Sequence, residues 1–386
     1  HFGADHHLSA VAGVGGYKQD FKSYSITVFN LPTEAVENNN LGLAEQHDLD
    51  ITNSRKAEFT KLSQFGRLSY TFKGRYILGV TVRRDGSDRF PPSKKWGFFP
   101  GVSLGWTMSE ESFMSSLAWI DNLKLRAGYG TTGNDNVVRD GYYYLDQYVG
   151  GSLYGMVYSF GGQPKKGMSY YVGRNENFVW QTDETINAGA DFSFFKGRLS
   201  GSLDVFQRTT KDLLGYTHPP ITSPVAQLAT NIGSQHFRGI ELGINVDIIR
   251  KNGFSWDAYL NLSHLKRTWG DRDPNETLEK WVGAHDEVNA VYGWKTDGIF
   301  QSREEVQNYK NEDGELYQPT SHPGNLKYVD INKDGKLDGD DVVKLGCTDP
   351  KLNFGFGTTV RYKGFDLTIG TYGAIGMLTK DSWAYT

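Results

Sequence analysis

The sequence contains 386 residues, 38% of them hydrophobic, with a formal net charge of −4 at pH 7. No apolar run approaches the roughly 20 residues of a membrane-spanning helix, and no basic stripe suggests a nucleic-acid partner. Cys347 is the sole cysteine, which excludes an intramolecular disulfide and a cysteine-based zinc cluster.

Alternating apolar and polar residues predict an all-β chain of roughly eleven to thirteen strands. The clearest pattern lies at 238–264, where Ile240, Leu242, Ile244, Val246 and Ile248 share one face and polar residues share the other. Each of its two strands has roughly ten residues, close to the about 9–11 that cross a bilayer when tilted. The clearest predicted strands are 8–17, 65–73, 75–84, 97–107, 121–130, 184–195, 198–208, 238–249, 254–264, 352–362 and 365–374.

Four tight turns of similar chemistry join neighbouring strands. They lie at 72–75, 195–198, 251–253 and 362–365, and each contains a lysine and a glycine. Asn252-Gly253 is the strongest of these hairpin signals, because a type I′ turn needs positive φ at both central residues. We expect glycine to supply the positive φ and the basic residue to keep the turn in water.

The other ends of these strands lead into long segments near 21–59, 133–177 and 268–351. Short turns at one end and long loops at the other are typical of outer-membrane β-barrels. Abundant aromatic residues, 14% of the chain, would supply the girdles at both membrane interfaces. The sequence therefore predicts part of a large antiparallel transmembrane β-barrel. An open sheet does not survive in lipid, so we expect further strands outside this sequence.

Several blocks in order resemble the SusC/RagA family of TonB-dependent outer-membrane transporters. These blocks are RRDGSDRF (83–90), WGFFPGVSLGW (96–106), LKLRAGYGTTGN (123–134), TKDLL (210–214), NIGSQHFRGIEL (231–242), YGWKTDGIFQS (292–302), YVDINKDGKLDGDD (328–341) and YKGFDLTIG (362–370). The resemblance covers nearly the whole chain, and its blocks are specific in combination.

The resemblance implies a 22-stranded barrel, an N-terminal plug and a SusD-like lipoprotein that caps the barrel. It also implies import of glycans or peptides across a Gram-negative outer membrane, driven through TonB, and dimers of transporter–lid pairs. Residues 1–386 read as a partial barrel domain, with the plug, the TonB box and the final strands outside it. The start of the chain has no signal-peptide pattern, so we expect an internal piece.

One segment has the spacing of an EF-hand-type calcium loop. Oxygen-bearing side chains stand at positions 1, 3, 5, 9 and 12, with glycine at position 6. The expected ligands are Asp330, Asn332, Asp334, Lys336 through its carbonyl, Asp338 and Asp341. The ion would be structural Ca²⁺ or Mg²⁺. The alternative is an Asx-rich turn that keeps this shape without metal.

Aromatic residues gather in two of the long segments and suit either sugar stacking or packing within the loops. They are Tyr142, Tyr143, Tyr144, Tyr148, Tyr154, Tyr158, Tyr170, Tyr171 and Trp180 in one, and Trp281, Tyr292 and Trp294 in the other. The inward carboxylates Asp204, Glu241 and Asp247 are better read as lumen lining than as a glycosidase pair. No catalytic arrangement is predicted.

The sequence therefore predicts a SusC-like importer of oligomeric nutrients, most of all glycans, and not an enzyme. One alternative is a TonB-dependent siderophore or cobalamin receptor without a lid. A second is a soluble carbohydrate-binding β-protein with structural calcium, whose outward faces, such as 240–248, would pack against a second sheet.

Overall fold

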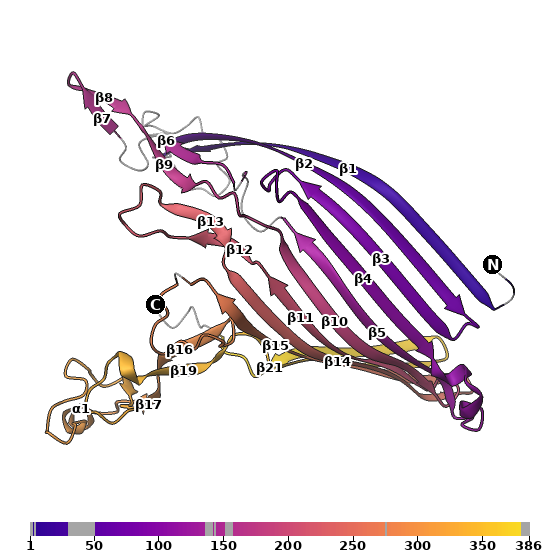
Figure 1. The fold of residues 1–386 in the computed structure, drawn as a ribbon. Coiled ribbons are helices and arrows are strands. Elements are labelled where there is room, and N and C mark those ends of the chain that lie inside the picture. Colours follow the sequence, from indigo (N-terminus) through magenta and orange to yellow (C-terminus); the bar gives the residue numbers. More distant parts are fainter. Residues whose placement is uncertain are drawn as a thin grey trace.

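The computed structural model describes residues 3, 5–29, 51–135, 142, 144–150, 157–274 and 276–379. Its main feature is one curved antiparallel sheet of eleven strands, in which each strand pairs with the next along the chain (Figure 1). The strands are β1 (His6–Thr27), β2 (Ile51–Phe72), β3 (Tyr76–Ser87), β4 (Trp96–Thr107), β5 (Ile120–Asn134), β10 (Gln181–Phe194), β11 (Leu199–Lys211), β14 (Gly233–Lys251), β15 (Phe254–Arg272), β20 (Leu352–Tyr362) and β21 (Phe365–Ile375). The predicted all-β barrel fold is confirmed.

The strands are longer than predicted at the end that carries the loops. β1 and β2 stay paired out to Thr27 and Ile51, so much of the expected loop at 21–59 is strand. β15 likewise continues to Arg272, inside the segment expected to be loop. Alternation marks a strand only where one face is apolar, whereas backbone hydrogen bonds continue where both faces are polar.

The four tight turns lie together at one end of the sheet, at the lower right of Figure 1. Asn252 and Gly253 have φ of 51° and 75°, the geometry of the type I′ turn predicted there. Lys73 and Gly74, with 51° and 68°, and Lys363 and Gly364, with 46° and 88°, share it, whereas the turn at 195–198 has three consecutive residues with positive φ. The sequence assigned positive φ to the glycines, but the preceding lysines share it. A longer connection at the same end carries the short 3₁₀ helices η3 (Met108–Glu110) and η4 (Ser112–Met114).

The two faces of the sheet differ in polarity across many strands. On one face Leu78 pairs with Leu104, and farther along Leu242 pairs with both Leu203 and Leu262. In the described residues no second sheet covers this face, and Ile240 remains 44% exposed. The soluble alternative therefore lacks the packed sheet that it requires. The expected regular face extends to Val246, beyond which a bulge places Ile249, not Ile248, opposite Trp256.

Aromatic rings lie directly over glycines on the neighbouring strand. A Cβ on Gly357 would lie 2.2 Å from the ring of Tyr259, its cross-strand partner. A Cβ on Gly239 would lie 2.4 Å from the ring of Phe206, again its direct partner. These pairs let rings lie flat along the sheet. They give one structural use for the high glycine and aromatic content.

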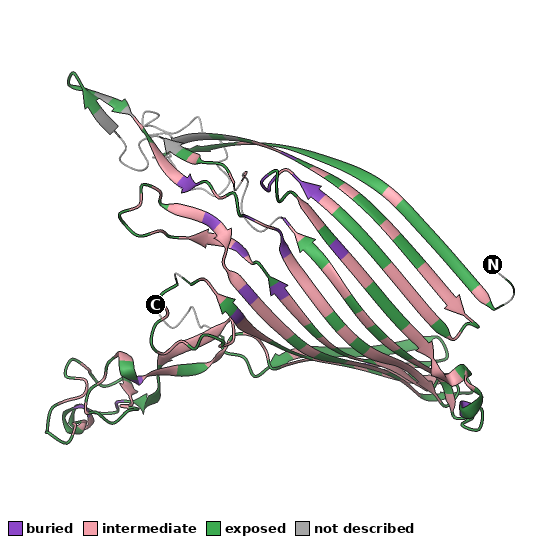
Figure 2. Cartoon of the chain, in the orientation of Figure 1, coloured by how far each residue is buried: buried purple, intermediate pink, exposed green. Residues whose placement is uncertain are grey.

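Smaller elements leave the other end of the sheet, where the buried residues also gather (Figure 2). A four-stranded sheet is formed by β12 (Leu214–Thr217), β13 (Gln227–Asn231), β9 (Met168–Gly173) and β6 (Gln147–Gly150). The other elements are three two-stranded sheets, β7 (Val157–Phe160) with β8 (Gln163–Lys166), β16 (Ala290–Trp294) with β19 (Val342–Cys347) and β17 (Thr296–Ile299) with β18 (Leu326–Tyr328), and the helices α1 (Arg303–Asn308) and η6 (Gly339–Asp341). Among the described residues, no helix is both long and apolar enough to span a membrane.

Candidate functional site: the polar face and the outer loops

The polar face of the sheet carries a charge cluster that spans three strands. Arg126 on β5 forms a two-point contact with Asp191 on β10, with both N–O distances 2.9 Å. Its Nη2 also lies 3.0 Å from an oxygen of Asp204 on β11. Two parallel N–H···O bonds to one carboxylate are the geometry that arginine favours, and they fix the orientation of the guanidinium. The predicted role of Asp204 as lumen lining agrees with this position.

Gly189 makes room for the charge cluster of Arg126, Asp191 and Asp204. It lies between Arg126 and Asp204 in the strand register, and a Cβ there would lie 2.3 Å from an Asp204 oxygen. Beside the cluster is a hollow of about 390 Å³ on β11, β14, β15 and β20. Its polar lining includes Ser202, Asp204, Glu241, Asn261, Ser263 and Asn353. This surface offers hydroxyl, amide and carboxylate groups in a row, which can bind a hydroxyl-rich or charged ligand.

On β4 the apolar face is bounded by aromatic residues at both ends, the arrangement expected of aromatic girdles. Trp96 and Trp106 stand on this face near opposite ends of β4, ten positions apart. Ten residues of tilted strand rise roughly 25 Å, the height of the apolar band of an outer-membrane barrel. Arg84 stacks over Trp96 with its guanidinium carbon 4.3 Å from the ring centroid, which keeps the charge at the band's edge.

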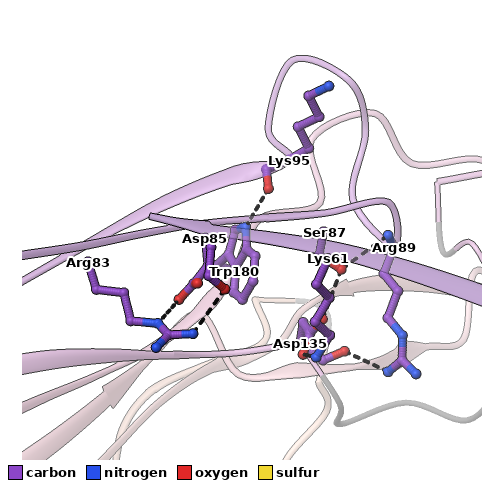
Figure 3. A network of polar contacts seen from close by, with 9 residues as sticks. Lys61, Arg83, Asp85, Ser87, Arg89, Lys95, Asp135 and Trp180 are labelled. Atoms are coloured by element: carbon purple, nitrogen blue, oxygen red, sulfur yellow. Dashed lines mark hydrogen bonds and ion pairs between the residues drawn. The ribbon is translucent and has the colours of Figure 1, made fainter. Parts of the chain in front are cut away.

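A buried ionic network holds the rim of the sheet where the loops begin (Figure 3). Asp135, after β5, accepts from the Lys61 ammonium at 2.6 Å and from the Ser87 hydroxyl at 2.8 Å. The Arg89 guanidinium donates to the backbone oxygen of Asp135 at 2.9 Å. The Asp135 side chain is only 6% exposed. The sequence gives the block 83–90 no structural role. In the structure its residues Ser87 and Arg89 join the loop ends of three strands through Asp135.

A buried aromatic cluster attaches the four-stranded outer sheet to this rim. The ring of Phe90 stacks 4.8 Å from Trp180 and 5.7 Å from Phe178, centroid to centroid. Val172 on β9 and Leu214 on β12 belong to the same cluster. The outer sheet is therefore anchored by apolar burial, and sequence reasoning missed this because the contributing segments lie far apart in the chain.

The loop aromatics predicted as a group are divided by the structure. Trp180 is core, and its indole N–H donates to the Lys95 carbonyl at 3.1 Å. Tyr148 and Tyr170 stack with ring centroids 5.2 Å apart on the outer sheet. Tyr143 and Tyr154 lie outside the described residues. Packing among the loops therefore accounts for several of these rings, while Tyr148 stays more than half exposed.

The outer segment after β15 is held by its own polar contacts. Asp286 accepts from the Tyr292 hydroxyl and, at 2.8 Å, from the Gly283 amide. Burial and the hydrogen bond to Asp286 raise the pKa of Tyr292 to about 12. The hydrogen bond from Tyr292 in turn brings the pKa of Asp286 below its ordinary value. Lys344 on β19 adds an ion pair with Glu287 at 2.5 Å.

The predicted metal loop, 330–341, is a compact turn whose side-chain oxygens accept from backbone amides. Asp330 accepts from Lys333 at 2.6 Å and from Gly335 at 2.9 Å. Burial raises the pKa of Asp330, but these amides outweigh that effect and the net pKa lies below its ordinary value. Asn332 accepts from the Asp334 amide at 3.0 Å, and Gly335 has φ +85°. The sharp bend predicted at this glycine is present.

The last part of the loop is tied to the first by Asp341. Asp341 is fully buried and accepts from the amides of Ile331 at 2.8 Å and Asp338 at 3.0 Å. Lys336 donates its amide to Asp334 at 2.9 Å. Within the described parts of the chain, no group of three or more His, Cys, Asp and Glu side chains is placed to hold a metal ion. Binding of Ca²⁺ or Mg²⁺ by this loop stays a prediction, since the expected ligands also include an amide and a carbonyl.

Known proteins resemble this chain in sequence and in fold. A family model described as TonB dependent receptor-like, beta-barrel matches residues 1–385. The TonB-dependent receptor SusC of Bacteroides thetaiotaomicron is 33% identical over 317 residues, which cover 80% of this chain and 30% of SusC. The TonB-dependent receptor P26 of Formosa agariphila is 30% identical over 387 residues, covering 97% of this chain and 38% of that protein.

Solved structures show the same fold. The structure of the RagAB peptide transporter superposes with a TM-score of 0.73 at 20% identity, covering 97% of this chain and 39% of that chain. This chain thus spans between 30% and 39% of the length of these relatives. The relatives by sequence are TonB-dependent receptors, and the relative by structure is a peptide transporter. The chain belongs to the TonB-dependent receptor β-barrel family and, within it, to the SusC/RagA type.

Proposed function

We propose that the full-length protein imports oligomeric nutrients, glycans or peptides, across the outer membrane with energy delivered through TonB. The main support is the 33% identity to SusC over 80% of this chain. The charge cluster at Arg126 and the neighbouring hollow add a polar inner wall suited to hydroxyl-rich or charged oligomers. RagAB is a peptide transporter of the same fold, so peptides remain the second substrate class.

The outer loops fit a role in capture under a SusD-like lipoprotein. The segment from β16 to β19 stands away from the sheet at its loop end (Figure 1) and is cross-linked by ion pairs and aromatic contacts. A preorganised loop binds a partner with less loss of conformational entropy than a disordered one. In this proposal the loops form the docking surface of the lid, and transporter–lid pairs associate as dimers.

Capture of the lid is the direct test. We expect full-length protein, tagged and extracted from outer membranes in detergent, to bring down a stoichiometric SusD-like lipoprotein, identified by mass spectrometry. Replacing 296–328 by a short linker removes β17, α1 and β18 and should abolish this capture. Recovery of native protein without any lipoprotein would favour the lidless siderophore or cobalamin receptor.

A matched control keeps the loops and changes the opposite end of the sheet. Lys73→Asn and Lys363→Asn alter two tight turns and should leave lid capture at the native level. The captured lipoprotein can then be purified and titrated with oligosaccharides and with peptides. Its preference distinguishes the two proposed substrate classes. Loss of the lid in both variants would mean that the barrel itself, not 296–328, had been damaged.

We also propose that the loop at 330–341 binds structural calcium. Its side-chain oxygens at Asp330, Asn332 and Asp334 line one turn of chain around a glycine bend, the ligand order of EF-hand-type loops. Such extracellular loops bind with dissociation constants on the order of 10⁻⁴–10⁻³ M. Calcium is expected to protect Lys333 and Lys336, two exposed trypsin sites in the loop.

Calorimetry and proteolysis of the native protein and two variants test the calcium proposal. Asp330→Ala should abolish both the heat of binding and the protection. Asp340→Ala is the matched control, because Asp340 pairs with Lys280 and is outside the expected ligand set. If the native protein gives no heat at millimolar calcium, the loop keeps its shape by hydrogen bonds alone.

A further inference from the structure

The tight turns lie together at one end of the sheet (Figure 1), and their sequences are rich in lysine and arginine. We call them the basic turn set: Lys73, Arg75, Lys196, Arg198, Arg250, Lys251 and Lys363. Six of the seven are exposed, Arg75 being half-buried. Each tight turn contributes at least one member, so the charge is spread along the rim of the sheet and does not sit at one point.

Three of these lysines occupy an unfavourable backbone conformation. Lys73, Lys196 and Lys363 have φ of 51°, 61° and 46°. Asparagine, aspartate and glycine tolerate this left-handed region better than lysine does. The chain itself uses asparagine at the corresponding place in the fourth turn, where Asn252 has φ 51°. A locally unfavourable choice repeated three times indicates that the lysine side chain has a use of its own.

Two of the ammonium groups lie beside rings of the apolar face. The Lys73 Nζ is 5.3 Å from the ring centroid of Phe72, and the Lys363 Nζ is 5.2 Å from that of Tyr362. Phe72 continues the row of Leu68 and Tyr70, and Tyr362 continues that of Val360. These ammonium groups therefore lie where the apolar band ends, at the height of lipid headgroups.

Two carboxylates at this end pair with arginines of the basic turn set. Glu111 accepts from Tyr76 at 2.5 Å, from Trp106 at 3.0 Å and from Arg75 at 3.3 Å. Asp247 pairs with Arg250 at 2.9 Å. Among the described residues, Lys73, Lys196, Lys251 and Lys363 have no carboxylate at ion-pair distance. Four ammonium groups at the rim of the apolar face are therefore left outside ion pairs.

We propose that the basic turn set binds headgroups of anionic phospholipids in the periplasmic leaflet of the outer membrane. A phosphate at that depth complements the free ammonium groups while its acyl chains cover the apolar face. The inference rests on the membrane orientation of the proposed importer, with short turns facing the periplasm. It does not depend on the substrate or on the lid.

The test compares lipid binding by full-length protein and by Lys73→Asn/Lys196→Asn/Lys363→Asn. Native mass spectrometry follows titration with phosphatidylglycerol, phosphatidylethanolamine and lipid A. The native protein should prefer phosphatidylglycerol, and each lost lysine should weaken that binding roughly fivefold at low salt. Asparagine suits the left-handed turn, so the variant should fold, as heat-modifiable gel migration will confirm.

Two further variants complete the design. The same three lysines changed to arginine keep the charge and should retain the preference. Lys94→Asn/Lys165→Asn/Lys310→Asn removes three exposed lysines from the loop end and should retain it as well. Equal binding of phosphatidylglycerol and phosphatidylethanolamine by the native protein, a preference for lipid A, or equal loss in the loop-end variant would overturn the proposal. Lid capture is measured separately, so its failure would leave a lipid preference intact.

Discussion

Leu260→Arg is expected to destabilise the folded barrel by about 2–4 kcal/mol, the range for a basic residue facing lipid near the bilayer midplane. Leu260 lies on the apolar face of β15, between Ile244 on β14 and Phe356 on β20. It is four residues beyond Trp256, which stands at the turn end of the same face. A guanidinium placed there must shed its water or draw water into the hydrocarbon. Denaturant-dependent folding of the full-length protein into lipid vesicles measures the change.

The matched control is the next residue along the same strand. Asn261→Arg places the same side chain on the polar face, where Asn261 is exposed and borders the hollow. Its effect is expected to stay within about 0.5 kcal/mol, as for surface substitutions generally. Equal destabilisation by the two variants would mean that the two faces have been assigned wrongly.

Asp135→Ala is expected to destabilise the loop end of the sheet by about 2–4 kcal/mol. It leaves the Lys61 ammonium and the buried Ser87 hydroxyl without their shared acceptor. The lower end of this range allows for Lys61. Its side chain is a third exposed, so its ammonium can be solvated by water once Asp135 is removed. The outer sheet, anchored beside this network, should become more open to proteolysis at moderate denaturant.

A double-mutant cycle separates the ion pair from simple loss of packing. Lys61→Met removes the cation but keeps much of the side-chain volume. The combined Lys61→Met/Asp135→Ala variant should be less destabilised than the sum of the single changes, by about 1–3 kcal/mol. Strict additivity would show that Asp135 acts through Ser87 and the backbone and not through the ion pair.

Strand positions could be predicted because the apolar face marks each strand where it crosses the membrane. All eleven predicted strands are present, and the Asn252-Gly253 turn has the expected positive φ. Strand ends could not be predicted, since Thr27 and Ile51 lie beyond the apolar band and pair through the backbone. The bulge at Ile248 also has no signal, because an extra residue leaves an apolar run looking continuous.

Much less of the candidate site could be predicted. Alternation alone predicts that Asp204 lines the lumen, but its partner Arg126 lies 78 residues away in sequence. Lys61 and Asp135 are likewise 74 residues apart, and nothing local links them. The loop at 330–341 was found because its spacing is local. Its hydrogen bonds were not foreseen, because a ligand pattern does not say which amides will share the carboxylates.

The rings that lie over glycines also bear on the width of the pore. A barrel's diameter follows from its number of strands and from its shear, the summed stagger of neighbouring strands. A two-residue slip of β11 against β14 would set Phe206 against Phe237 or Glu241 instead of Gly239, and either side chain would occupy the ring's place. A slip of one residue would turn the apolar face inward. The glycine–ring pairs thus fix the stagger between neighbouring strands. Through the shear, they also fix the diameter of the channel.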